Sequence, residues 1–186
     1  MSSPESKQIR ATFVKSVEPV ATPIEVQRQE WEAAVEAVNQ TLEVTVIPAD
    51  LDGVPGEWVK TEATIGPGMI LHLHGGGYNA GSCKTHRTMA AHLARASGVP
   101  VLLIDYRLAP EYPCPAAVED TVKAYRWLLQ NGFSAQQIIL GGDSAGGGLA
   151  VAALVQLRDE GVDLPAATFL MSAWLDLALE LSLIHI

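Results

Sequence analysis

The segment from residue 138 to residue 159 constrains the fold of this chain more than any other. It begins with three apolar residues, Ile138-Ile139-Leu140, which predict a short buried strand. A Gly-rich corner follows, and then a helix-prone run from Leu149 to Asp159. The corner contains the pattern G-x-S-x-G with Ser144 at its centre. In a strand–turn–helix of this kind the serine lies on a tight turn with its hydroxyl exposed above the sheet, which suits a nucleophile.

Two other interpretations of this corner are open at first sight. Gly-rich strand-to-helix turns also bind phosphates, and serine is a common first residue of helices. A P-loop requires a lysine after its last glycine, but Leu149 follows Gly148 here. The glycines do not fit the dinucleotide pattern G-x-G-x-x-G either. A nucleophilic serine is therefore the favoured interpretation of Ser144.

The composition suits one soluble α/β domain with a sizeable core, because 48% of the 186 residues are hydrophobic and 18% are charged. The net charge of −9 argues against nucleic-acid partners and against a basic membrane-binding face. No stretch approaches the length of a membrane span, and Met1–Arg10 shows no secretion signal. Cys83 and Cys114 lack the spacing of a disulfide framework. We therefore expect free thiols and a cytoplasmic protein.

The first part of the chain predicts one helix and two strands. Residues 1–21 are expected to be irregular, and Thr22-Pro23-Ile24-Glu25 has the pattern of a helix start. Apolar residues then recur at helical spacing from Trp31 to Val38. Leu42–Val46 alternates like a half-buried strand, and Glu57–Lys60 predicts a second strand. The two strands should form an antiparallel lead-in to the sheet.

From Gly68 onward strands and helices alternate. Strands are expected at residues 69–73, 101–104, 138–140 and 167–172, and helices at 85–97, 116–131 and from near Ser144 to about 160. This alternation predicts an α/β fold with a mostly parallel sheet and helices on both faces. The strand at 167–172 has no predicted neighbour on its far side and would form an apolar edge that promotes aggregation.

Three loops follow the carboxyl ends of parallel strands, where such sheets bind ligands. One of them contains Gly75-Gly76-Gly77, which either forms a tight turn or leaves backbone N–H groups uncovered for a ligand. A carbonyl attacked by a serine becomes an oxyanion that needs such donors. We assign this role to the N–H groups of Gly76, Gly77 and Ala145, the last of these following the nucleophile.

The residues around these donors have supporting roles. His74 and Gly75 are expected to orient the loop, and we do not assign His74 as the general base. Asp143 should lie exposed beside Ser144 and is not assigned as the catalytic acid. Tyr78 either lines the substrate pocket or packs in the core. No metal or organic cofactor is called for, because histidines and cysteines do not cluster at ligand spacing.

Three motifs together resemble those of the hormone-sensitive-lipase-like esterases, also called bacterial family IV carboxylesterases. They are His74-Gly75-Gly76-Gly77-Tyr78, Asp105-Tyr106-Arg107-Leu108-Ala109-Pro110-Glu111 and Gly142-Asp143-Ser144-Ala145-Gly146-Gly147. The segment Trp174-Leu175-Asp176 is similar to a fourth family motif. The resemblance covers roughly residues 25–180.

The resemblance implies an α/β-hydrolase fold that cleaves short- to medium-chain carboxylic esters without a cofactor. It also implies that the N-terminal helix forms part of a cap over the active site. On this basis we divide the chain into residues 1–40 with the cap helix, a partial core at 41–180, and 181–186. Small-molecule esters are the expected partners, and a homodimer of the full-length protein is compatible with the family. Tyr106, Arg107 and Glu111 should lock their loop, with an arginine–carboxylate pair among them.

The chain departs from the family after the serine. The triad runs in the order serine, acid, histidine, and the only histidine after Ser144 is His185. Leu181–Ile186 back-translates to a sequence that looks like a transposon adapter used in DNA sequencing libraries, so we expect natural sequence to stop near Glu180. Without its acid and base, this chain alone should be inactive.

Other functions remain open at this point. The plant gibberellin receptor resembles the same family, keeps the serine motif and lacks the catalytic histidine, so a non-catalytic ligand-binding protein is the main alternative. Hydrolysis of amides or lactones by the same residues is a weaker one. The identity of the residue at the histidine position would separate catalysis from binding.

Overall fold

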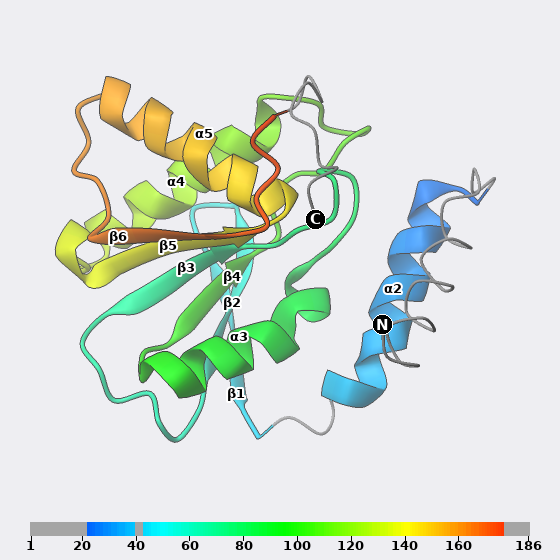
Figure 1. Ribbon diagram of the computed structural model, residues 1–186, viewed down its shortest axis with the longest axis horizontal. Helices are drawn as coiled ribbons and strands as arrows, with labels where there is room; N and C mark the ends of the chain where they lie inside the picture. Colours follow the sequence, from blue (N-terminus) through cyan, green and yellow to red (C-terminus); the bar gives the residue numbers. More distant parts are fainter. Residues whose placement is uncertain (1–21, 40–42, 177–186) are drawn as a thin grey trace, which may run out of the picture.

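The computed structural model describes residues 22–39 and 43–176 (Figure 1). The expectations for residues 1–21, for Leu42 and for the tail at 181–186 therefore lie outside the described residues. The helices are α2 (Ile24–Asn39), α3 (Cys83–Ser97), α4 (Ala116–Gln130), the 3₁₀ turn η1 (Ala135–Gln137) and α5 (Ala145–Asp159). The strands are β1 (Thr45–Asp50), β2 (Pro55–Lys60), β3 (Met69–Leu73), β4 (Val101–Ile104), β5 (Ile138–Asp143) and β6 (Ala167–Met171).

The strands form one six-stranded sheet in the order β1-β2-β4-β3-β5-β6. β1 pairs with β2 and β2 with β4 in antiparallel fashion, whereas β4, β3, β5 and β6 are parallel to one another. This confirms the mostly parallel sheet with an antiparallel lead-in. The parallel strands end at the same edge, so the loops after β3, β4 and β5 meet there.

Helices cover both faces of the sheet, as expected. α4 and α5 lie on one face and α3 lies on the other (Figure 1). The core under α4 and α5 contains Tyr125, Leu128, Leu149 and Leu157, and the core under α3 contains Ala90, Ala94 and Val101. All four residues of β4 are buried, which confirms that it is a central strand covered on both faces.

The first strand lies later in the chain than its sequence suggested. We expected Leu42–Val46, but β1 covers Thr45–Asp50 and pairs from Thr45↔Lys60 to Asp50↔Pro55. The alternation of side chains begins before the ladder, and the Asp52-Gly53 turn sets the register. Pro48 is accommodated because β1 has a partner strand on only one side among the described residues.

Two element boundaries around the site were also placed too late or too early. α3 begins at Cys83, two residues before the expected start, because Ser82 caps its first turn together with Thr85. β5 continues to Asp143, three residues past its expected end, whereas α5 starts at Ala145, in agreement with the helix start expected near Ser144. The Gly-rich corner therefore belongs to regular structure on both sides. Only Ser144 separates the strand from the helix.

Helix α2 lies apart from α4 and α5 and packs on α3 (Figure 1). Of its apolar residues, Trp31 and Val35 are half-buried and Ala34 is exposed. Trp31 contacts the ring of His86 edge-on, with the ring centroids 6.0 Å apart. The helix also forms ion pairs with the rest of the chain, Arg28 with Glu111 and Glu32 with Lys84.

Candidate active site

Ser144 occupies a strained turn between β5 and α5. Its backbone has φ 51° and ψ −119°, a conformation that costs about 1–3 kcal/mol for a residue with a side chain. The surrounding chain holds it there: Ser144 N donates to Met171 O at 2.9 Å, and Trp174 N donates to Ser144 O at 2.8 Å. Ser144 is exposed, as the sequence predicted, so its hydroxyl can meet a ligand.

The two glycines of the G-x-S-x-G pattern are needed because the backbone of the first turn of α5 lies very close to the ends of β3 and β5. A Cβ on Gly146 would lie 2.0 Å from Leu73 O, and one on Gly142 would lie 2.3 Å from Gly146 O. Contacts this short are impossible without moving the backbone. The glycines therefore let the first turn of α5 sit directly on the end of β3, which brings Ser144 next to the loop that starts at His74.

That loop carries uncovered backbone donors. Gly76 and Gly77 have φ values of 129° and 64°, and the N–H groups of Asn79 and Ala80 close the turn by donating to Gly76 O at 3.2 and 2.9 Å. Within the described part of the chain, the N–H groups of Gly76, Gly77 and Ala145 have no hydrogen-bond partner. These are the three groups that the sequence assigned to an oxyanion.

Asp143 is not exposed beside the serine, contrary to our expectation. Its half-buried carboxylate lies 3.1 Å from His72 Nε2, accepts the Gly75 N–H at 3.1 Å, and lies 3.4 Å from His86 Nε2. Burial raises the pKa of Asp143, but its hydrogen bonds with His72 and His86 outweigh burial and hold the pKa well below the usual carboxyl range. Asp143 therefore ties the elbow to the glycine loop and does not reach into solvent.

His74 is buried beside the glycine loop for which we expected it to have an orienting role. It is 1% exposed, and because a carbonyl can only accept, its Nδ1–H donates to Gly75 O at 2.9 Å. The ring stacks on Tyr106 with the centroids 4.2 Å apart. Burial lowers the pKa of His74 to about 3, so the ring is neutral at physiological pH. A buried imidazole with this pKa is a poor general base.

Sequence reasoning did not find His86. This α3 residue is buried, its Nδ1 lies 2.8 Å from the Thr85 hydroxyl, and its Nε2 lies 3.3 Å from the Gly75 amide. It packs against both His72 and His74, at 6.3 and 5.5 Å between centroids. No motif surrounds it, and the late expected start of α3 gave no reason to orient it toward the site.

Tyr78, for which the sequence left a pocket role and a packing role open, is half-buried. Its backbone O accepts the Ala109 N–H at 2.9 Å, and its ring lies 6.2 Å from that of Trp174. A Cβ on Gly148 would lie 2.8 Å from the Tyr78 hydroxyl, so the ring lies over the first turn of α5. Trp174 itself donates from Nε1 to Asp176 O at 2.9 Å.

The loop after β4 is locked by ion pairs, but the partners differ from the expected ones. Arg107 binds Asp120 and Glu119 on α4, whereas Glu111 binds Arg28 on α2. Neither pairing could be found within the motif, because both partners come from other elements. Tyr106 donates from its hydroxyl to His74 O at 2.7 Å, so this loop also supports the glycine loop.

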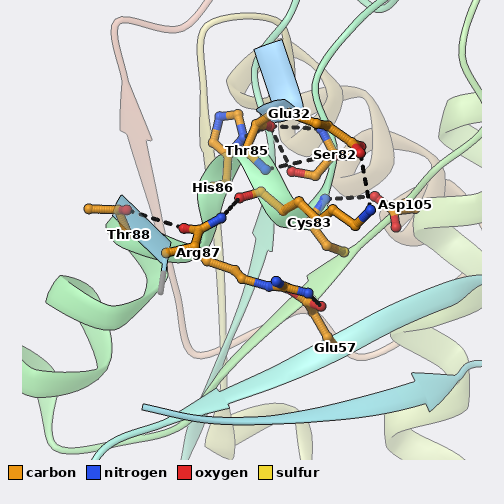
Figure 2. Close-up of polar contacts among 11 residues, drawn as sticks. Glu32, Glu57, Ser82, Cys83, Thr85, His86, Arg87, Thr88 and Asp105 are labelled. Carbon is orange, nitrogen blue, oxygen red and sulfur yellow. Dashed lines mark hydrogen bonds and ion pairs between the residues drawn. The ribbon is translucent and has the colours of Figure 1, made fainter. Parts of the chain in front are cut away.

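The start of α3 is fixed by two carboxylates (Figure 2). Asp105 accepts the Cys83 N–H at 2.6 Å, and Glu57 on β2 binds Arg87 through two hydrogen bonds of 2.6 and 2.7 Å.

A cavity of about 230 Å³ lies between the start of α3, α2 and the loop after β4. Its lining includes Arg28, Glu32, His74 and Asp105. A larger hollow of about 670 Å³ lies at the opposite edge of the sheet, near Lys60 and Arg95, and away from the serine.

The described histidines do not supply a base for Ser144. His72, His74 and His86 make the contacts given above, and His92 is exposed on α3. In residues 22–39 and 43–176, none of them forms a hydrogen bond with the serine hydroxyl.

The described residues contain no group of three or more His, Cys, Asp or Glu side chains that could hold a metal ion. None of their helices is long and apolar enough to cross a membrane.

The comparisons with known proteins agree with this geometry. A family model described as alpha/beta hydrolase fold matches residues 70–183. An acetyl-hydrolase of Streptomyces hygroscopicus is 43% identical over 183 residues, which cover 97% of this chain and 60% of the relative. The hormone-sensitive lipase of Mus musculus is 39% identical over 101 residues, or 52% of this chain and 13% of the lipase.

A solved structure shows the same architecture. The crystal structure of an esterase from the bacterial hormone-sensitive lipase family superposes with a TM-score of 0.86 at 44% identity, covering 95% of this chain and 59% of that one. The chain belongs to the α/β-hydrolase fold family. Within it, the chain belongs with the hormone-sensitive-lipase-like esterases, and it spans 60% of the length of the Streptomyces relative.

Proposed function

We propose that the protein is a carboxylic-ester hydrolase in which Ser144 is the nucleophile. The observation that carries this proposal is the juxtaposition of an exposed serine on a strained elbow with a loop of uncovered N–H groups. An acyl-transfer site needs these two features side by side.

In the proposed reaction the Ser144 hydroxyl oxygen attacks the ester carbonyl carbon, and its proton passes to a histidine outside the described residues. The carbonyl oxygen becomes an oxyanion that accepts hydrogen bonds from Gly76, Gly77 and Ala145, and the dipole of α5 adds to its stabilisation. The bond between the carbonyl carbon and the alcohol oxygen then breaks, and the alcohol leaves with the proton from that histidine. Water attacks the acyl-serine in the same way, which releases the acid and restores the serine hydroxyl. Asp143, His74 and Gly75 hold the donors in place and do not exchange protons with the substrate.

We propose that the histidine and the acid that activate Ser144 lie outside the described residues. Two observations support this: none of the described histidines contacts the serine, and the chain spans only part of the length of its relatives. The 186-residue chain and its Ser144→Ala variant should then hydrolyse p-nitrophenyl acetate at the same rate. A faster rate for the unmodified chain would show that it holds its own base.

Short acyl chains are the proposed substrates. Relatives named acetyl-hydrolase and ethyl acetate hydrolase, at 43% and 45% identity, support an acetyl-sized or slightly larger acyl group. Tyr78 and Trp174 are the proposed pocket wall, because the Tyr78 hydroxyl and the Trp174 backbone oxygen lie next to Gly148 in the first turn of α5 and the two rings lie 6.2 Å apart. Rates with p-nitrophenyl acetate, butyrate and palmitate test this, and a preference for palmitate would contradict it.

Sequencing the coding DNA beyond Glu180 would distinguish a catalytic protein from one that only binds a ligand. An acid followed by a histidine at the family's positions would support a hydrolase. A different residue at the histidine position would favour a binding protein on the same scaffold. The same sequence tests whether Leu181–Ile186 is natural, because an intact template that encodes this tail would disprove its origin in an adapter.

A further inference from the structure

We propose that Arg28, on helix α2, is a positioning residue that holds the oxyanion loop in its donor geometry. This inference rests on the proposed function of that loop. It begins with the guanidinium group, which donates to Asn79 O from Nε at 2.7 Å and to Ala109 O from Nη2 at 2.8 Å. The same group binds both carboxylate oxygens of Glu111 at 2.8 and 2.9 Å.

The two carbonyl groups belong to the two loops that meet at the site. Asn79 closes the turn over Gly76 through its own N–H, which donates to Gly76 O. Ala109 donates its N–H to Tyr78 O, so it already touches the same turn from the other side. Arg28 therefore lies at the junction of the two loops and adds one hydrogen bond to each.

The oxyanion loop needs such support from outside. Three consecutive residues, Gly76, Gly77 and Tyr78, have positive φ values of 129°, 64° and 63°. A tyrosine in this region is strained, and such a conformation persists only where the surroundings fix it. Among the described residues, two groups from outside the turn form hydrogen bonds with its last residues. The Arg28 guanidinium donates to Asn79 O, and the Ala109 N–H donates to Tyr78 O.

Arginine suits this position because its donors form a rigid, planar fork. Nε and Nη2 donate to carbonyl groups on two different loops. Nη1 and Nη2 also bind the Glu111 carboxylate, which fixes the plane of the guanidinium group. A lysine would keep the positive charge but present its donors from a single atom. An ordinary exposed ion pair would contribute little, and replacing Arg28 by lysine would then have little effect.

Amide exchange in the 186-residue chain tests this directly, because it does not depend on activity. The reporters are the N–H groups of Asn79, Ala80 and Ala109, which are hydrogen-bonded in the loop. We expect Arg28→Lys to accelerate their exchange about tenfold, the factor for losing one hydrogen bond to a charged group. Glu111→Gln should accelerate their exchange less than Arg28→Lys does, since glutamine keeps one acceptor oxygen for the guanidinium group and both carbonyl contacts of Arg28 remain.

The matched control is Arg126→Lys, because Arg126 on α4 also forms an exposed ion pair, with Glu160 at the end of α5. Unchanged exchange at the three loop amides in Arg28→Lys would overturn the proposal. If Arg28→Lys accelerated amide exchange in the buried strand β4 as much as in the loop, the proposal would be overturned as well. Arg28 would then stabilise the whole fold and not the loop in particular.

Kinetics then show whether the loop geometry serves catalysis. In a form of the protein that hydrolyses p-nitrophenyl acetate, Arg28→Lys should lower kcat about tenfold and change KM less than about twofold, as expected for a partly misplaced oxyanion donor. A rise in KM at constant kcat would contradict a positioning role. If no form of the protein hydrolyses esters, the proposed function fails, whereas the exchange experiment still decides the role of Arg28.

Discussion

At the scale of single residues, the site is held together by buried polar groups with fixed protonation states. Asp143 is ionised and links β3, α3 and the elbow, whereas His74 is neutral and orients Gly75. Because each group is half-buried or fully buried, a change in its charge should alter stability as well as activity. Two predictions follow from this arrangement.

The first concerns His74. Burial depresses its pKa from 6.5 to about 3, so the unfolded chain binds a proton that the folded chain does not as the pH falls below 6.5. The stability that depends on the neutral ring is complete above pH 6.5 and declines as the pH falls toward 3. Between pH 6.5 and 5 the loss should be about 2 kcal/mol. Urea unfolding at pH 6.5 and at pH 5 measures this loss of unfolding free energy. The loss should be smaller in His74→Gln. An equal loss in the variant would show that the buried His74 ring does not cause it.

The second concerns Asp143. Its depressed pKa means that the ionised form stabilises the fold above the ordinary value of 3.8, and that this stability is lost as the pH falls further. Asp143→Asn should lower the free energy of unfolding at pH 7 by about 1–3 kcal/mol, because the histidine partners lose their charged acceptor. It should also flatten the pH dependence below pH 5 relative to the unmodified chain. Unfolding curves that overlay at all pH values would contradict this role.

At the scale of elements, the elbow depends on how closely α5 approaches β3. Gly146→Ala would place a Cβ 2.0 Å from Leu73 O, so we expect it to cost about 3 kcal/mol or more. Gly132→Ala is the matched control: its φ of 97° is strained for alanine, but nothing lies within 4 Å, so about 1–2 kcal/mol should be lost. Chemical denaturation compares the two. Gly146 is not among the positive-φ residues, so a loss at Gly146 no larger than at Gly132 would contradict the close approach of α5 as the reason for this glycine.

The elements also show what could be predicted from the sequence. The strand–corner–helix around Ser144 and the glycine loop after β3 are local patterns, so their positions and conformations could be predicted correctly. The partners of Asp143 and Glu111 could not, because His86 and Arg28 approach from other elements and carry no motif of their own. Strand and helix boundaries such as those of β1 and α3 depend on pairing register and capping, which a hydrophobic pattern does not define.

At the scale of the whole molecule, the edge strand β6 is the weak point of the described fold. It pairs with β5 on one side, and within residues 22–39 and 43–176 no strand covers the other. Its Leu170 is 39% exposed. An uncovered apolar edge of this kind favours pairing between chains.

We therefore expect the 186-residue chain to self-associate, and Leu170→Lys to reduce that association, since a lysine on an edge strand opposes pairing. Val155→Lys is the matched control, because Val155 is a similarly exposed apolar residue but lies on α5. Sedimentation velocity at several concentrations measures the effect. If both variants reduced association equally, general surface hydrophobicity and not the β6 edge would be responsible.

The central claim is that Ser144 is the nucleophile of an ester hydrolase, and it concerns the protein extended through the coding sequence beyond Glu180. The most direct measurement is the rate of p-nitrophenyl acetate hydrolysis by that protein, by Ser144→Ala, and by Ser134→Ala as a control at the opposite end of β5. We predict that Ser144→Ala lowers kcat by about a thousandfold or more and that Ser134→Ala leaves it unchanged. Hydrolysis that persists at the full rate in Ser144→Ala would contradict the account.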